Sequence, residues 1–186
     1  MSSTQEKLYV FDLDHTLWPF DCDKDVIAPF TGIPFVGTLD RLGRYAEPFK
    51  DVRKIFEDIA ETGEKVAIAS RNPSQGPCEE LLRAIKISPP SKPEITCLWD
   101  VVGQGLFHAY SSQGRHAKTK HLEAIKETSG VDYRNMIFFD DLPENIAYAA
   151  TSGVVAIYLK NGLTQEALKK GIELWQKKLN PPKPNE

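Results

Sequence analysis

Four short, continuously apolar runs recur along the chain, separated by segments that have helical periodicity. The runs are KLYVF (7–11), KVAIAS (65–70), NMIFF (135–139) and VVAIYL (154–159). Runs that are apolar throughout, rather than at alternate positions, are typical of strands buried on both faces. Such strands alternating with helices predict a parallel sheet with helices on both faces, a doubly wound, Rossmann-like α/β domain.

Five segments carry apolar residues at helical spacing and are expected to cover this sheet. They are residues 48–63, 76–87, 117–130, 143–153 and 164–179. In the first of them, Val52, Ile55 and Ile59 share one helical face, and Gly63 supplies a helix stop signal. The spacing therefore predicts five amphipathic helices.

Two segments fit neither pattern. Residues 17–47 are rich in proline, glycine and aromatic residues, and they are predicted to form a minimal cap after the first strand, with a hairpin around Asp40 to Gly43. Residues 88–116 contain one strand candidate, ITCLWDV, in an otherwise irregular stretch. Long irregular segments in a compact domain are usually functional or mobile, and the sequence leaves open whether these two close over a binding site.

Length and charge limit the classes of protein to which the chain can belong. The 186 residues suit one domain, 1–186, with a flexible proline-rich tail over 180–186. A net charge of −3 without a Lys/Arg cluster argues against nucleic-acid binding. The sequence lacks a signal peptide, a long apolar span and paired cysteines, and no obligate protein partner is evident. We therefore expect a cytoplasmic protein without a membrane partner, and the small size leaves a nuclear pool open.

Polar and charged residues gather where the predicted strands end. They are Asp12 and Asp14 after the first strand, Ser70, Arg71 and Asn72 after the second, Asp140 and Asp141 after the third, and Lys118 at the start of the helix before that strand. The carboxyl ends of parallel strands meet at one edge of the sheet, which is where such folds bind ligands. These side chains are therefore predicted to converge.

Four converging carboxylates repel one another unless a cation lies among them. Mg²⁺ prefers a few carboxylate oxygens together with waters and phosphate, whereas Ser70 and Lys118 suit an anionic ligand. Each part alone has an ordinary explanation: D-x-D solvates a strand end, and DD caps a helix. Their joint occurrence at successive strand ends indicates phosphoryl-transfer chemistry with Mg²⁺ as the cofactor.

The residues of these strand ends resemble the motifs of the haloacid dehalogenase superfamily of phosphatases. FDLDHT is similar to its first motif, hhhhDxDxT, Ser70 in AIASRN to the second, Lys118 to the third and IFFDDLPENI to the fourth. FDLDHTLWPF, ASR and MIFFDDLPENI are more narrowly similar to the small magnesium-dependent phosphatase family, with TLWPF the most specific part. The resemblance covers about residues 7–160.

This resemblance implies a set of catalytic and metal-binding roles. Asp12 would be the nucleophile that becomes an aspartyl phosphate, and Asp14 would be the general acid and then the general base. Mg²⁺ would be held by the Asp12 carboxylate, the Asp14 backbone carbonyl and Asp141, with Asp140 as a further ligand or as a support for the others.

The resemblance also implies substrate contacts. Ser70 and Lys118 would hold the phosphate oxygens, and Arg71 and Asn72 would line the substrate entrance. Leu13 is included among the substrate-contacting residues, although its side chain is predicted to point away, into the core.

Several alternatives stay open at the level of sequence. His15 either contacts substrate or shields the site. A group of aromatic residues either floors a substrate pocket or belongs to the local core: Trp18, Phe20, Phe30 and Phe35. The expected reaction is hydrolysis of a phosphomonoester, in sugar phosphates or in phosphoproteins that include phosphotyrosine. The alternatives are a phosphotransferase of the same fold and a non-enzymatic, receiver-like phospho-acceptor module.

Overall fold

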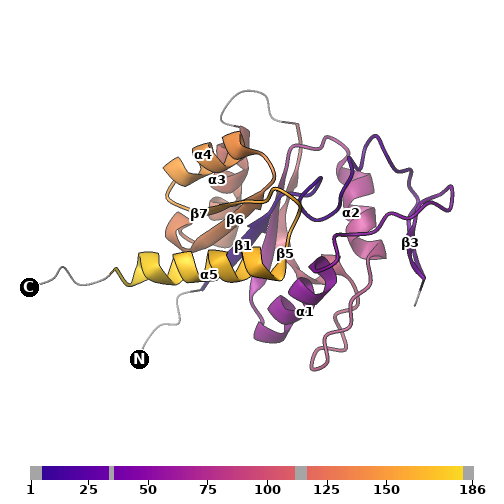
Figure 1. Cartoon of the computed structure of the whole chain (residues 1–186), viewed down its shortest axis with the longest axis horizontal. Coiled ribbons are helices and arrows are strands. Elements are labelled where there is room, and N and C mark those ends of the chain that lie inside the picture. Colours follow the sequence, from indigo (N-terminus) through magenta and orange to yellow (C-terminus); the bar gives the residue numbers. More distant parts are fainter. Residues whose placement is uncertain (1–5, 34–35, 112–116, 182–186) are drawn as a thin grey trace, which may run out of the picture.

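A five-stranded parallel sheet forms the centre of the molecule in this computed structural model, which describes residues 6–33, 36–111 and 117–181 (Figure 1). Its strands lie in the order β5–β4–β1–β6–β7. Their bounds are β1 Leu8–Phe11, β4 Lys65–Ser70, β5 Val102–Ala109, β6 Met136–Asp140 and β7 Val155–Tyr158. The four predicted strands are thereby confirmed.

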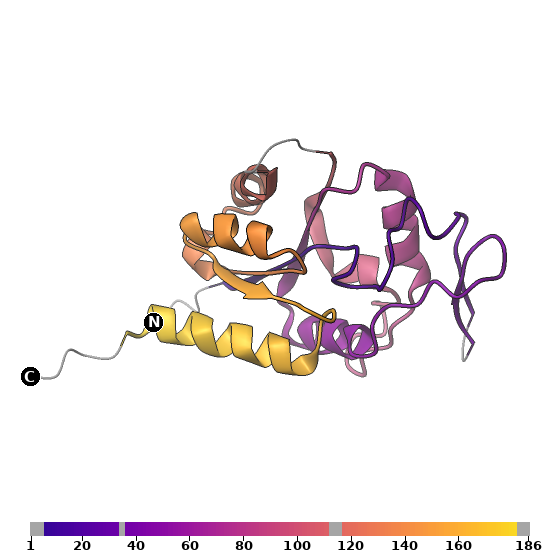
Figure 2. The same ribbon diagram turned by 45° about the horizontal axis from the view of Figure 1, so that its top comes forward.

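Helices cover both faces of this sheet, as the sequence predicts. They are α1 Val52–Thr62, α2 Gln75–Ala84, α3 Ala117–Ser129, α4 Pro143–Thr151 and α5 Gln165–Leu179. The apolar side chains of α1, α2 and α5 pack on one face, and those of α3 and α4 pack on the other (Figure 2). The architecture is therefore a doubly wound α/β fold.

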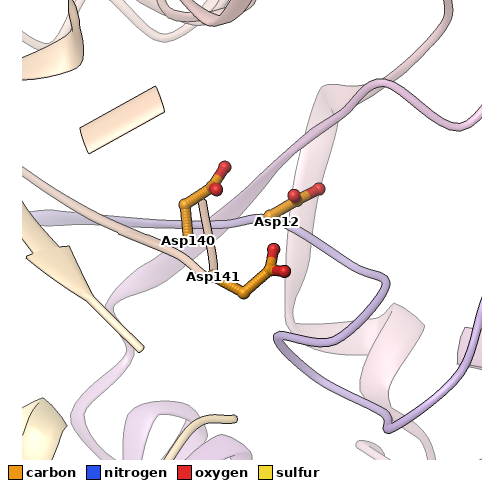
Figure 3. A group of neighbouring side chains, drawn as sticks. All are labelled: Asp12, Asp140 and Asp141. Atoms are coloured by element: carbon orange, nitrogen blue, oxygen red, sulfur yellow. The ribbon is translucent and has the colours of Figure 1, made fainter. Parts of the chain in front are cut away.

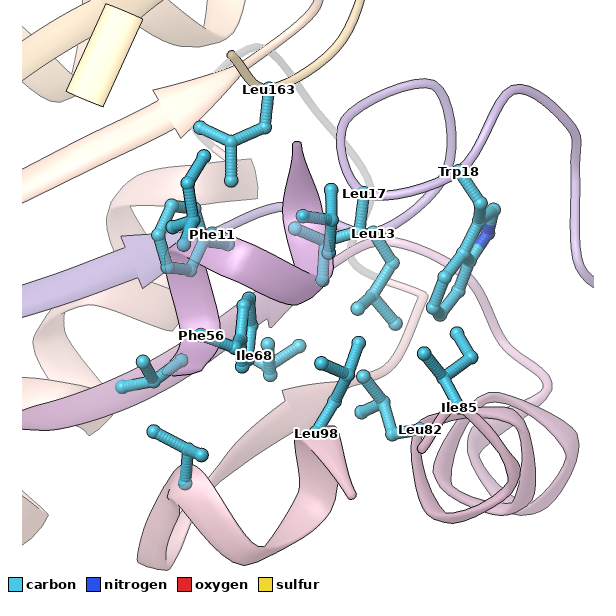
Figure 4. Close-up of a cluster of buried hydrophobic side chains, with 14 of the residues drawn as sticks. Phe11, Leu13, Leu17, Trp18, Phe56, Ile68, Leu82, Ile85, Leu98 and Leu163 are labelled. Atoms are coloured by element: carbon cyan, nitrogen blue, oxygen red, sulfur yellow. The ribbon is translucent and has the colours of Figure 1, made fainter. Parts of the chain in front are cut away.

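Side-chain alternation explains why the strands are apolar throughout. Tyr9 and Phe11 point into the cluster under α1, α2 and α5, whereas Leu8 and Val10 point into the cluster under α3 and α4. All four are at most 2% exposed. Figure 4 shows the first of these clusters around Phe11. Since both faces of β1 are buried, no position along it tolerates a polar residue before the strand ends.

The order of the strands places a crevice at the end of β1. The chain runs from β1 to β4 and β5 on one side, then returns across β1 to β6 and β7 on the other. Ligands bind in doubly wound sheets where the strand order reverses, outside the carboxyl ends of the strands. The residues that follow β1 therefore lie at the point of the sheet best suited to a ligand.

The predicted strand over ITCLWDV is wrong. Residues Leu98–Val101 form a short 3₁₀ helix, η1, and the edge strand β5 starts only at Val102. The Asp100 carboxylate accepts hydrogen bonds from the backbone N–H groups of Thr96 (2.8 Å) and Cys97 (3.2 Å) and so closes the turn. Because β5 contains two glycines, its pattern is weak in the sequence. A second 3₁₀ helix, η2, spans Tyr133–Asn135.

Residues 17–47 lie between β1 and α1 and contain two antiparallel pairings, one of which was not predicted. The strands β2 Thr31–Ile33 and β3 Gly37–Leu39 pair in antiparallel fashion, so their connection spans 34–36. The predicted hairpin around Asp40 to Gly43 is confirmed: Leu39 pairs with Tyr45 in antiparallel fashion, and the Asp40 N–H donates to the Arg44 carbonyl (2.9 Å). Part of the predicted tail, 182–186, lies outside the described residues.

Within the part of the chain that the structure describes, no helix is both long and apolar enough to cross a membrane.

Candidate active site

A cavity of about 320 Å³ opens at the carboxyl ends of β1, β4 and β6. Six residues singled out from the sequence line it: Asp12, Asp14, Ser70, Arg71, Asn72 and Asp141. The convergence predicted from the strand ends is therefore present. The remaining lining includes His15, Asp21, Asp23 and Lys24, which come from the loop after β1.

Lys118 lies behind this cavity, between two buried carboxylates. Its Nζ is 2.9 Å from Asp12 Oδ1 and 3.1 Å from Asp140 Oδ2, and it also donates to the Ala69 carbonyl. An ammonium group has three hydrogens, so these three acceptors use all of them. Lys118 is 1% exposed. One positive charge is thus shared by two carboxylates, and Lys118 would have to exchange one partner to hold a phosphate oxygen.

Burial dominates the ionisation of Asp140. Burial, and next to it the negative charge of Asp12, raise the pKa of Asp140 to about 7. The positive charge of Lys118 acts in the opposite direction and favours the ionised form. Hydrogen bonds favour the ionised form as well: Leu142 N–H donates to Oδ1 (2.8 Å), and Asn145 Nδ2 reaches both oxygens (2.9 and 3.0 Å). Both oxygens of Asp140 therefore have protein donors.

Asp12, Asp140 and Asp141 form a carboxylate cluster in which one oxygen from each residue lies within 4.8 Å of the others (Figure 3). Burial and the proximity of Asp12 raise the pKa of Asp141. Three carboxylates with one ammonium leave an excess of negative charge, which a hard divalent cation would neutralise. The donor set fits Mg²⁺. Because the Asp140 oxygens are already hydrogen-bonded, Asp12 and Asp141 are the better placed direct ligands.

Asp14 faces a different set of groups. Its Oδ1 accepts from Trp18 Nε1 (2.7 Å) and from the backbone N–H of Cys22 (3.0 Å), and its Oδ2 accepts from Asn72 Nδ2 (2.6 Å). Burial raises the pKa of Asp14, against these hydrogen bonds, which favour the carboxylate. The Asp14 carboxylate groups with Asp21 and Asp23 instead of with the carboxylate cluster. A metal contact from Asp14 would therefore come from its backbone carbonyl, as the resemblance implies.

The residues after β4 divide between a buried pair and an exposed cation. Ser70 is 1% exposed, and its Oγ accepts from the Asn72 N–H (3.2 Å). Asn72 also bridges Asp14 to Asp23, with Nδ2 3.2 Å from Asp23 Oδ1. Its side chain is therefore occupied by the loop after β1. Arg71 is exposed at the cavity, and no carboxylate among the described residues pairs with it.

Within the loop after β1, Leu13 and His15 point in opposite directions. The Leu13 side chain is fully buried in the core, and only its backbone N–H faces the site, where it donates to Asp12 Oδ1 (2.8 Å). His15 adopts a left-handed conformation (φ 57°) that turns its half-exposed side chain toward Asp21. His15 and Asp141 also border a second cavity of about 380 Å³, which reaches Lys160. The mouth of the site therefore has two lobes.

Asn145 was not recognised from the sequence as a residue of the site, and the role of Trp18 was left open. Asn145 anchors Asp140 from the first turn of α4, and Trp18 contacts Asp14. The position of Asn145 five residues after Asp140, just past a helix-starting Pro143, is a signal that could have indicated its role. Of the aromatic residues considered for a pocket floor, Trp18 and Phe30 are buried in the core cluster, Phe20 packs against it, and Phe35 lies outside the described residues.

A family model described as acid phosphatase matches residues 5–178. The chain belongs to this phosphatase family. Magnesium-dependent phosphatase 1 of Homo sapiens is 30% identical to the phosphatase over 92% of this chain and 88% of the human protein. A HAD-like hydrolase superfamily protein of Schizosaccharomyces pombe is 32% identical over 75% of this chain and 77% of its own length. The phosphatase is thus a magnesium-dependent member of the haloacid dehalogenase superfamily.

Solved structures confirm the fold of the phosphatase. One is the N-terminal part of a Bacteroides fragilis protein, containing a phosphatase domain complexed with Mg (TM-score 0.56, 18% identity); it matches 96% of this chain, which spans 41% of that structure. Another is a haloacid dehalogenase-like hydrolase of Streptococcus pneumoniae (TM-score 0.50, 11% identity), matched over 90% of this chain and 91% of its own. At these identities the likeness supports the α/β fold alone.

Proposed function

We propose that the phosphatase hydrolyses phosphomonoesters through an aspartyl phosphate on Asp12, with Mg²⁺ held by Asp12, Asp141 and the Asp14 backbone carbonyl. One observation carries this proposal: Lys118 is the shared partner of two buried carboxylates, and a third lies within 4.8 Å. The negative charge of such a cluster exceeds that of its one ammonium group, so the cluster favours binding of a divalent cation. A bound cation in turn attracts an anionic substrate. When bound, Mg²⁺ offsets the repulsion between the Asp12 carboxylate and an anionic phosphate.

The chain's own residues account for each proton in the proposed reaction. An Asp12 carboxylate oxygen attacks phosphorus while the bond to the leaving oxygen breaks, and protonated Asp14 gives its proton to that oxygen. The resulting Asp14 carboxylate then takes a proton from water as the water oxygen attacks the same phosphorus. This second step releases inorganic phosphate and restores both the Asp12 carboxylate and protonated Asp14.

The open mouth supports a range of substrates, including sugar phosphates and phosphoproteins with phosphotyrosine. We propose that residues 17–47 act as a small cap that leaves both lobes accessible. Lys24 is paired with Asp21 (3.0 Å), but Arg71 in one lobe and Lys160 in the other have no ion-pair partner among the described residues. These two cations favour anionic substrates. We place the phosphatase in the cytoplasm, with a nuclear pool open, and without a nucleic-acid or obligate protein partner.

A trapping experiment tests the proposed chemistry. The phosphatase is mixed with p-nitrophenyl phosphate and Mg²⁺, quenched in acid, and analysed by mass spectrometry for a phosphorylated peptide that contains Asp12. We expect this acyl phosphate and multiple turnovers, both abolished by EDTA and by Asp12→Asn. Stoichiometric labelling without turnover would instead support the receiver-like module, and transfer of the phosphoryl group to an added alcohol in preference to water would support a phosphotransferase. Normal turnover by Asp12→Asn would overturn the proposal.

A further inference from the structure

Trp18 combines a buried ring with one polar atom aimed at the active site. The residue is fully buried, and Figure 4 shows its ring beside Leu13 and Ile85 of the core. Its Nε1 nevertheless donates to Asp14 Oδ1 at 2.7 Å. A buried indole N–H needs an acceptor, and here that acceptor is the proposed general acid.

The hydrogen bonds of Asp14 distinguish its two oxygens. Oδ1 receives both Trp18 Nε1 and the Cys22 N–H (3.0 Å), so neither of its lone-pair positions remains for a proton. Oδ2 receives only Asn72 Nδ2 (2.6 Å) among the described donors and keeps one position free. Asn72 lines the cavity, whereas Trp18 lies in the core, so Oδ2 is the oxygen on the substrate side.

We propose that Trp18 is a positioning residue for the proposed phosphomonoester hydrolysis. Its indole N–H, together with the Cys22 N–H, holds Oδ1 of Asp14 and thereby presents Oδ2 to the leaving oxygen. This assignment rests on the proposed role of Asp14 as the general acid. It gives a function to Trp18, for which the sequence left the choice open between a substrate-pocket floor and local core.

The backbone around Trp18 makes this arrangement rigid. The N–H of Leu17 donates to the Leu13 carbonyl (2.7 Å), closing one turn between the acid and the indole. Two distant segments hold that turn in place: Phe49 N–H donates to the Leu17 carbonyl and Leu163 N–H to the Thr16 carbonyl (both 2.9 Å). Because the turn is fixed, the indole cannot follow a displaced carboxylate. Small displacements of a catalytic group lower reaction rates strongly, so such fixation matters for catalysis.

Two aryl esters of similar shape separate positioning of the acid from general damage. Phenol has a pKa of about 10, like tyrosine, so phenyl phosphate needs a proton on its leaving oxygen, whereas p-nitrophenolate leaves readily without one. For Trp18→Phe, which keeps a ring but lacks the N–H, we expect kcat for phenyl phosphate to fall about tenfold. We expect kcat for p-nitrophenyl phosphate to fall less than twofold and KM to stay unchanged for both.

Trp175→Phe is the matched control, because Trp175 Nε1 is buried without a hydrogen-bond partner among the described residues. Trp175→Phe should leave unchanged the ratio of kcat for phenyl phosphate to kcat for p-nitrophenyl phosphate. Asp14→Asn should lower that ratio more than Trp18→Phe does. If Trp18→Phe lowers both esters equally, or neither, while Asp14→Asn lowers the ratio, the positioning role is wrong and the proposed function stands. If Asp14→Asn itself leaves the ratio unchanged, the role of Asp14 in the proposed function is wrong.

A spectroscopic measurement does not depend on the folding of Trp18→Phe. The indole N–H resonances of the three tryptophans are recorded in ¹⁵N-labelled protein and assigned with the Trp99→Phe and Trp175→Phe variants. The Trp18 resonance should lie downfield and move upfield in Asp14→Asn, since a carboxylate accepts a stronger hydrogen bond than an amide. A Trp18 resonance that does not move in Asp14→Asn would overturn the contact and the proposal with it.

Discussion

Asp40 in the cap and Asp140 in the sheet are both shielded carboxyl groups, yet their pKa values move in opposite directions. Burial alone would raise the pKa of Asp40, but hydrogen bonds from the Arg44 side chain and from the backbone of Arg44, Leu42 and Ile27 lower it to about 2. For Asp140, burial prevails and raises the pKa to about 7.

The difference lies in what each carboxylate must share. The Arg44 guanidinium binds Asp40 through Nε (2.9 Å) and a terminal nitrogen (2.6 Å), and no second carboxylate competes for these donors among the described residues. Lys118, by contrast, serves Asp12 and Asp140 at once. Asp40, which has a cation of its own, is fully neutralised and stabilises a turn. Asp12 and Asp140 share one cation, so negative charge remains that a metal ion can neutralise. Structural and catalytic carboxylates are thus separable by their partners.

The largest expected effect comes from a matched pair of Asp→Asn variants. Asp12→Asn should lower kcat for p-nitrophenyl phosphate by at least about 10³-fold, because an amide cannot act as the nucleophile. The same change should raise the Tm of the metal-free protein by about 2–4 °C, since Asp140 then has Lys118 to itself.

Its control, Asp40→Asn, should do the opposite. Turnover stays near that of the unaltered protein while Tm falls, because Arg44 and three backbone donors lose a charged acceptor. Enzyme assays and thermal melts in EDTA measure both variants. An Asp12→Asn protein that is less stable than the unaltered one without metal would contradict the idea that sharing a cation is costly.

Removing the shared cation should be the next largest effect. Lys118→Met leaves Asp12 and Asp140 buried without their ammonium, and we expect the free energy of unfolding to fall by about 3–5 kcal/mol in urea denaturation. Arg44→Met should cost less, because half of that side chain is exposed to solvent. Equal losses for the two variants would show that the carboxylates do not differ in the way proposed.

Mg²⁺ should stabilise the sheet edge and leave the cap unaffected. At a free concentration 100 times its Kd, a bound ion stabilises the folded state by about 2.7 kcal/mol, which raises Tm by about 5–10 °C in a protein of this size. Thermal melts with Mg²⁺ or EDTA measure this shift. It should persist in Asp40→Asn and nearly vanish in Asp141→Asn, and a full shift in Asp141→Asn would exclude Asp141 as a ligand.

The smallest expected effect is a difference in pH dependence. In metal-free protein, burial raises the pKa of folded Asp140 above its unfolded value of 3.8 towards about 7, so the contribution of Asp140 to stability falls as pH rises through that window. Asp40 acts in the opposite sense, and its contribution is lost as pH falls from 3.8 towards about 2.

Urea denaturation of the unaltered protein and of each Asp→Asn variant over this pH range isolates the two contributions. The difference in free energy of unfolding between the unaltered protein and Asp140→Asn should change between pH 3.8 and 7. The corresponding difference for Asp40→Asn should change only below pH 3.8. A flat difference for Asp140→Asn would mean that Lys118 and Asn145 keep Asp140 ionised throughout.

Local pattern was sufficient for most of the fold. The four apolar runs predict β1, β4, β6 and β7, because burial on both faces leaves an uninterrupted run in the sequence. The edge strand β5 was misplaced, since Gly103 and Gly105 weaken its pattern and Asp100 closes a turn within the preceding apolar stretch. The hairpin around Asp40 to Gly43 was predicted correctly because its turn residues are conspicuous, whereas the pairing of β2 with β3 was missed.

The sequence by itself determined which carboxylates meet at one edge, since parallel strands end together and each carboxylate ends a strand or follows one: Asp12, Asp14, Asp140 and Asp141. Only the tertiary structure decided how they divide. Lys118, on α3, forms ion pairs with Asp12 and Asp140. Trp18 and Asn72 donate hydrogen bonds to Asp14, which therefore stands apart from that pair. Hydrogen-bond partners are chosen by distance and direction between remote segments, and no periodicity along the chain encodes them.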